Sequence, residues 1–147
     1  MHGFLLFLHL AGVFVWLGGM FFAVLCLHPS LAALAGKDRV ALMSGTLGRF
    51  LNYVIVAILL IWASGAGLLT GAGPASMPPG WHVMIGAALL MTLIFAYLYL
   101  GVFRRVRRAI AAGDMTQVPA LMGRIRSLVI VNLVLGTVAV AGVTILA

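Results

Sequence analysis

The sequence predicts an all-α integral membrane protein, a bundle of four transmembrane helices forming a single domain over residues 1–147. Three observations predict it. The chain is 65% hydrophobic and 7% charged, whereas a soluble domain carries about a quarter charged residues. Four apolar runs each have the roughly 20 residues that a helix needs to cross ~30 Å of hydrocarbon. Charged and turn-forming residues separate the runs. The expected spans are about 3–27, 50–70, 81–103 and 127–147.

The first apolar run, residues 3–27, contains no Lys, Arg, Asp or Glu. No Lys or Arg precedes it, and its apolar core is about twice as long as that of a signal peptide, so we expect a retained span. This run contains the imidazole of His9. An ionisable side chain inside a membrane helix is costly and usually functional. His9 is therefore the first candidate for a functional residue.

The connections between the runs differ sharply in charge. All nine Lys and Arg residues lie in segments 29–49 and 104–126, whereas the Pro- and Gly-rich turn 71–80 carries none. The two basic connections fall on one side of the membrane, and the positive-inside rule places that side in the cytoplasm. Both termini then face the exterior or periplasm, and we expect the inner (cell) membrane of a bacterium. This distribution also argues against nucleic-acid binding, because no basic soluble face is formed.

Helix signals extend the expected elements beyond the spans. Asp38 is expected to cap a helix that runs on into the second span, and the third span is expected to continue to a stop near Gly113. Ser30 is expected to cap a short helical turn that stops at Gly36. Asp114 is expected to cap a helix leading into the fourth span.

The two basic connections resemble each other in sequence. Gly36 and Arg49 have counterparts 77 and 75 residues later, about half the chain length away. A tandem repeat of two helical hairpins, related by an axis along the membrane normal, would produce this match. Shared loop composition is the other explanation. In the repeat, His9 corresponds roughly to His82, 73 residues later.

His9 and His82 form the candidate metal site. Both lie on spans that enter from the outer side, His9 ~10 Å along its helix and His82 in the first turn of its own. Helix tilt can absorb the difference in depth. Two imidazoles on separate helices suit haem b, one on each axial face of the iron. The sequence thus predicts a low-spin bis-histidine haem with an electron-transfer or sensing role, and a quinone or a redox protein as candidate partner.

Small and aromatic residues share the faces of these two histidines. Glycine beside a ligand lets a flat macrocycle approach the backbone, although tight helix–helix packing uses glycine in the same way. The candidate cofactor-contacting residues are Gly12, Trp16, Gly19 and Gly86.

Copper is the alternative to haem. His and thioether ligands near the outer face suit Cu(I). The candidate copper ligands are His2, His9, His82 and Met84. His28, at the cytoplasmic end of the first span, is expected to contact headgroups or water.

Short motifs carry a family resemblance over nearly the whole chain. They are His9-x6-Trp16-x-Gly-Gly19, Trp81-His82-Val-Met84 and Phe103-Arg-Arg-Val-Arg-Arg108. Together they resemble the copper-resistance protein D (CopD) family of membrane proteins, for which copper handling is implied by the name.

The four-span pattern and the His-x6-Trp spacing are also similar to the HemJ-type protoporphyrinogen oxidases. That resemblance implies a haem-binding histidine at His9 and, as an alternative function, oxidation of protoporphyrinogen IX in haem biosynthesis. The family also has a functional lysine early in the third span, whereas residues 81–103 contain no lysine. Whether the chain is an oxidoreductase, and whether it forms a homo-oligomer, stays open at this point.

Overall fold

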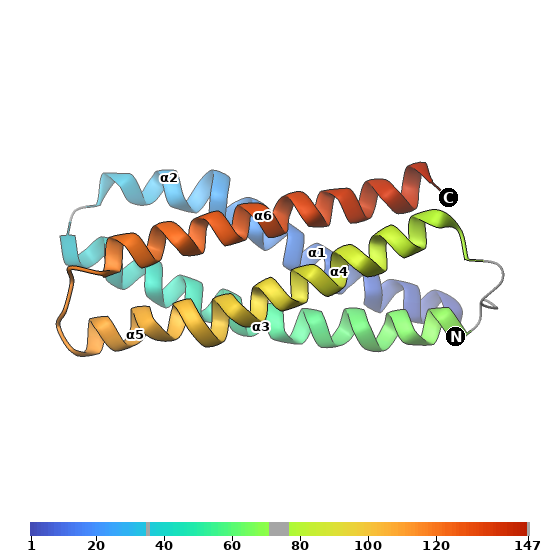
Figure 1. Cartoon of the computed structure of the whole chain (residues 1–147), viewed down its shortest axis with the longest axis horizontal. Coiled ribbons are helices and arrows are strands. Elements are labelled where there is room, and N and C mark those ends of the chain that lie inside the picture. Colours follow the sequence, from blue (N-terminus) through green and yellow to red (C-terminus); the bar gives the residue numbers. More distant parts are fainter. Residues whose placement is uncertain (35, 71–76, 147) are drawn as a thin grey trace.

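The computed structural model describes residues 1–34, 36–70 and 77–146, which form four long helical rods (Figure 1). The first rod consists of α1 (His2–Phe22), the π-helical segment η1 (Ala23–Leu27), α2 (His28–Ser30) and the 3₁₀ turn η2 (Leu31–Ala33). The second rod is α3 (Gly36–Thr70). The third consists of α4 (Pro79–Tyr97), the π-helical segment η4 (Leu98–Phe103) and α5 (Arg104–Ala111), and the fourth is α6 (Val118–Ile145).

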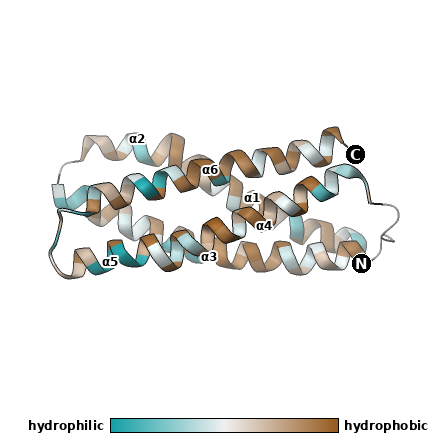
Figure 2. Ribbon diagram, viewed as in Figure 1, coloured by the Kyte–Doolittle hydropathy of each residue, from teal (hydrophilic) through white to brown (hydrophobic). Residues whose placement is uncertain are grey.

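All four rods are long and apolar enough to cross a membrane, which confirms the expected number of spanning-length helices. Large apolar side chains cover the outside of the bundle; Phe14, for example, is 79% exposed. Such a surface is compatible with contact to a lipid bilayer. Figure 2 shows hydrophilic residues gathered around α5 and the start of α6, at the end opposite the two termini.

The first rod does not end at Pro29. It continues to Ala33, and η1 ends at Leu27, two residues before the proline. Proline lacks a backbone N–H and its ring collides with the carbonyl four residues earlier, and a widened turn is compatible with it. Ser30 donates its hydroxyl to the Cys26 carbonyl at 2.8 Å. Ser30 therefore precedes a short turn, η2, as expected, but its side chain does not cap that turn.

Each of the two connections at the basic end contains a glycine with positive φ, Gly36 (+59°) in one and Gly113 (+73°) in the other. As expected, a helix runs unbroken into the second span and the third rod stops just before Gly113. Yet α3 already begins at Gly36, so Asp38 lies inside its first turn and the expectation that Asp38 is the cap residue is wrong. Asp114, however, does not cap a helix. It accepts hydrogen bonds from the Thr116 backbone N–H (3.1 Å) and the Gln117 amide (3.3 Å), and α6 begins only afterwards. Its carboxylate closes a local turn instead.

Helices α1 and α3 pack together as one pair, and α4 and α6 as another. A Cβ at Gly12 of α1 would lie 2.8 Å from Ile61 Cγ1 on α3, and a Cβ at Gly80 of α4 would overlap the Gly142 backbone on α6. Helix α1 also approaches α6. Helices α3 and α4 meet through long side chains: Trp62 Nε1 donates to Thr92 Oγ1 at 3.1 Å.

Buried positions repeat between the two halves of the chain. Buried positions of the first rod have buried counterparts 75 residues later in the third rod. The two π-helical segments, which begin at residues 23 and 98, are also 75 residues apart. The buried pairs are Gly12 and Ala87, Trp16 and Met91, Met20 and Phe95, and Leu31 and Val106.

In α3 and α6 the offset between buried positions is 78 residues. The pairs are Leu47 and Ile125, Leu51 and Val129, Val54 and Asn132, Ile58 and Gly136, Ile61 and Ala139, and Ser64 and Gly142. In the other pair of rods, every buried position of the first rod has a buried counterpart in the third, whereas Gly80, Leu98, Val102 and Phe103 are buried in the third rod alone.

Candidate functional site

His9 lies on the face of α1 that packs against α3. Its Nδ1 is 3.1 Å from the Ile61 carbonyl oxygen and 3.3 Å from Ser64 Oγ. The ring also lies close to Gly65, where a Cβ would be 3.3 Å from His9 Cε1. The side chain is half-buried. His9 is thus held by one turn of the neighbouring helix.

The contact with Ile61 determines which ring nitrogen of His9 carries the proton. A carbonyl oxygen only accepts hydrogen bonds, so Nδ1 must donate. The Ser64 hydroxyl itself donates to the Leu60 carbonyl, which leaves its oxygen to accept from His9. In the neutral ring Nε2 then carries the lone pair. A histidine that donates Nδ1–H to a carbonyl and presents Nε2 is the usual arrangement of a metal ligand.

The three residues that share the His9 face by sequence spacing have different surroundings. Gly12 touches Ala57 and Ile61 of α3, and Gly19 abuts the Phe50 ring. Both glycines therefore serve close packing of α1 on α3. Trp16 is 3% exposed and makes an edge-to-face contact with Phe95 of α4, with ring centroids 6.2 Å apart.

The described structure does not bring His82 to His9. His82 is exposed near the start of α4, and so is Gly86, beside which a Cβ would meet no atom within 4 Å. The 75-residue offset of buried positions makes Met84, not His82, the counterpart of His9. His82 lies two residues nearer the outer end, ~3 Å along α4 and about 200° around it. The expected correspondence between His9 and His82 is therefore displaced by two residues.

The other two histidines lie at opposite ends of the bundle. His2 is exposed at the start of α1. His28 lies at the basic end, within electrostatic reach of Arg39 and Arg126. Neither is near His9 along the first rod. Within residues 1–34, 36–70 and 77–146, no three His, Cys, Asp or Glu side chains gather into a metal-binding group.

Ser64 is the residue of this site that the sequence analysis missed. It is 2% exposed and 55 residues from His9 in the chain. A serine in an apolar helix usually bonds its own backbone, as Ser64 also does. Only the pairing of α1 with α3 reveals its contact with His9.

Comparisons of the chain with protein-family models, with curated proteins and with solved structures return no match. Function is therefore argued from the residues themselves.

Proposed function

We propose that this chain is a multi-pass membrane protein that binds haem b in the half of the bundle near its termini, and that it transfers electrons or senses redox state there. The arrangement of His9 carries the proposal, because Nδ1 donates to the Ile61 carbonyl and Nε2 is left as a ligand atom. Gly65 supports it as well, because it leaves room for the His9 ring where a larger residue would place its Cβ 3.3 Å from His9 Cε1.

The membrane placement rests on the four apolar helices and on the distribution of charge. All nine Lys and Arg residues lie in the two connections at one end. We assign that end to the cytoplasm of a bacterial cell and the termini to the outer side. The matching offsets of buried residues and π-helical segments support two hairpins that arose as a tandem repeat.

The second axial position distinguishes two kinds of haem protein. If His82 supplied the second ligand, as the sequence predicts, a bound haem would be held by two histidines and would supply electron transfer. If His9 alone held it, the haem would supply chemistry on a bound substrate such as a porphyrin. The resemblance to HemJ-type oxidases favours His9 as the one ligand, whereas the pair of histidines in the sequence favours ligation by both.

Optical spectra of the detergent-purified protein test the proposal. We expect a sharp Soret band, with resolved α and β bands on reduction. His9→Ala should remove the haem signal. His82→Ala distinguishes the two cases: a change from a six-coordinate to a five-coordinate spectrum would identify His82 as the second ligand, and an unchanged spectrum would leave His9 as the one histidine ligand. His28→Ala, at the far end of the same rod, is the matched control and should leave the spectrum intact.

Two results would overturn the proposal. One is a His9→Ala variant that keeps full haem occupancy. The other is a colourless wild-type protein that binds copper stoichiometrically, which would establish the copper alternative instead. A haem lost from His28→Ala alone would show that the ligands lie at the basic end.

A further inference from the structure

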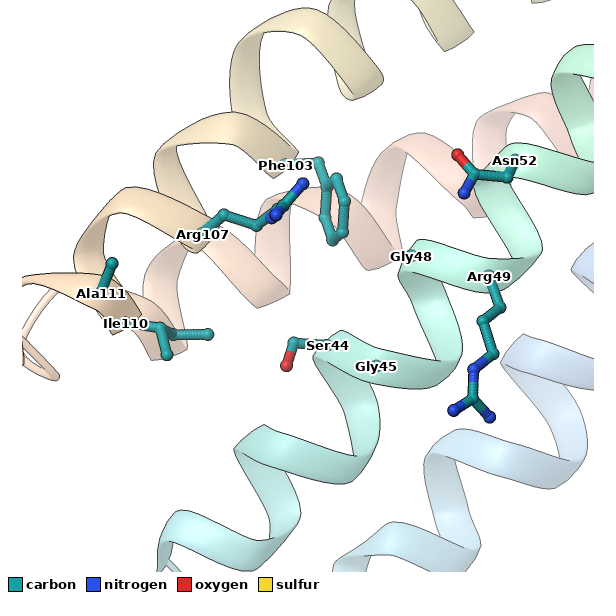
Figure 3. Close-up of a pocket in the computed structure, with 9 residues that line it drawn as sticks. All are labelled: Ser44, Gly45, Gly48, Arg49, Asn52, Phe103, Arg107, Ile110 and Ala111. Carbon is teal, nitrogen blue, oxygen red and sulfur yellow. The ribbon is translucent and has the colours of Figure 1, made fainter.

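Two neighbouring cavities lie between α3 and the third rod. The cavity at the basic end has a volume of about 460 Å³ and is shown in Figure 3. Its lining includes Ser44, Gly48, Arg49, Asn52, Phe103 and Arg107. The cavity nearer the middle of the bundle has a volume of about 300 Å³. Its lining includes Ile58, Leu59, Thr92, Phe95, Ala96 and Tyr99.

An aromatic stack joins the two cavities along the third rod. The rings of Phe95 and Tyr99 are stacked with centroids 5.9 Å apart, and those of Tyr99 and Phe103 are 6.4 Å apart. The Tyr99 hydroxyl donates to Asn52 Oδ1 across the junction at 3.4 Å. We call the two adjacent cavities together the groove; it is polar at the basic end and apolar further in.

The groove lies at one of two helix interfaces that the offsets of buried positions make equivalent. At the α1–α6 interface Leu17 fits against Gly136, where a Cβ would lie 2.8 Å from a Leu17 methyl carbon. By the offsets of 75 and 78, the counterparts of Leu17 and Gly136 are Thr92 and Ile58. Both line the inner cavity. On α3 the position equivalent to Gly136 of α6 carries the Ile58 side chain. This side chain keeps α3 and α4 apart.

The polar end of the groove is cationic. Arg49 and Arg107 line it, and Figure 3 shows the Arg107 side chain running past Phe103 while Arg49 extends away toward the first rod. The whole chain has two acidic residues against nine basic ones. One of the two, Asp114, is engaged by Thr116 and Gln117. Most of the arginines at this end therefore have no acidic residue of the chain to neutralise them, which leaves the groove attractive to an anion.

The apolar length of the groove matches one leaflet of a bilayer. From Phe103 to Thr92 the rod advances eleven residues, or ~16 Å at 1.5 Å per residue. Half of the ~30 Å hydrocarbon core is ~15 Å. An anionic headgroup at the cationic end and a chain reaching the bundle middle therefore fit together.

We propose that this groove binds one anionic glycerophospholipid from the leaflet at the basic end. Its phosphate lies near Arg107, within reach of Asn52 and Ser44, and one acyl chain lies along Tyr99 and Phe95. The proposal rests on the membrane placement of the bundle and is independent of haem. A failure to bind haem would leave it untouched.

Native mass spectrometry of the full chain in mild detergent tests this site, with phosphatidylglycerol and phosphatidylcholine of identical chains as probes. We expect one retained phosphatidylglycerol and much less phosphatidylcholine. Arg107→Gln should weaken phosphatidylglycerol retention about tenfold, the loss expected for one charge-assisted hydrogen bond. Arg104→Gln is the matched control, since it removes a charge one turn away that does not line either cavity.

A second variant tests the apolar part of the groove separately. Ala96→Phe should fill the inner cavity and reduce lipid retention while keeping every arginine. Inorganic phosphate should not displace the lipid. Equal retention of the two lipids, equal effects of Arg107→Gln and Arg104→Gln, displacement by phosphate, or displacement by an uncharged quinone would each overturn the proposal.

Discussion

His9 on α1 donates its Nδ1 proton to the carbonyl oxygen of Ile61 on α3 across 3.1 Å. This bond joins the one imidazole in the middle of α1 to the helix against which α1 packs, and it sets the tautomer of the ring. The strength and geometry of this hydrogen bond therefore control the direction in which the Nε2 lone pair points.

Removing the second partner of His9 should loosen the ring. Ser64→Ala deletes the hydroxyl 3.3 Å from Nδ1 and leaves the Ile61 carbonyl in place. We expect haem affinity to fall about tenfold, as is typical when a group that orients a ligand is lost. Haem titration of the purified apoprotein measures it. Thr70→Ala, which removes a hydroxyl from the same helix, should have no effect, and an equal loss there would contradict the assignment.

Adding a methyl group at Gly12 should destabilise the α1–α3 pair. The new Cβ would lie 2.8 Å from Ile61 Cγ1 and 3.0 Å from the Ala57 carbonyl oxygen. Overpacking of this kind costs about 1–3 kcal/mol. Thermal unfolding in detergent should show a lower midpoint for Gly12→Ala. Gly18→Ala on the same helix adds a methyl group into open space and should raise the midpoint or leave it unchanged.

Asn132 should be replaceable by Leu at little cost. Its amide donates to the Met91 carbonyl at 3.2 Å, but in the described part of the chain its buried Oδ1 has no partner. Removing an unsatisfied buried acceptor offsets the lost bond, so Asn132→Leu should change stability by less than about 1 kcal/mol or increase it. Asn132→Asp places a charge in the same site and should destabilise strongly. A large loss in Asn132→Leu would reveal a further polar partner.

Acid should weaken the turn before α6. Hydrogen bonds from the Thr116 hydroxyl and then the Thr116 backbone N–H hold the pKa of Asp114 below its ordinary value of 3.8; desolvation opposes them, and the Gln117 amide lowers the pKa further. A lowered folded-state pKa means that this stabilisation is present above the unfolded pKa and is lost as pH falls through the folded one. Thr116→Val should raise the pKa of Asp114 in an NMR titration. An unchanged value would show that the hydroxyl bond is not formed.

Membrane orientation can be measured with single cysteines. After Cys26→Ala removes the native thiol, Lys37→Cys should react with an impermeant maleimide only in inside-out vesicles. His2→Cys should react only from the outside. Labelling of both sites from one side would contradict the assignment of the basic connections to the cytoplasm.

The four spanning-length helices, the unbroken entry into α3 and the stop before Gly113 follow from sequence alone. They depend on apolar run length and on local turn chemistry, which any single segment carries. The same local rules were wrong for Ser30 and Asp114. A serine can bond the turn behind it, and an aspartate can close a turn before a helix starts.

Tertiary structure alone decided which side chains meet. The sequence marked His9 as costly, but its contact with Ile61 and Ser64 depends on how α1 is rotated against α3. The same holds for His82, which a two-residue difference in register turns about 200° away from the position equivalent to His9. The groove beside Ile58 also depends on how two similar hairpins pack, because equivalent positions of the two interfaces carry a glycine, Gly136, and an isoleucine, Ile58. Apolar periodicity defines a face of each helix, while contacts between faces are set by packing.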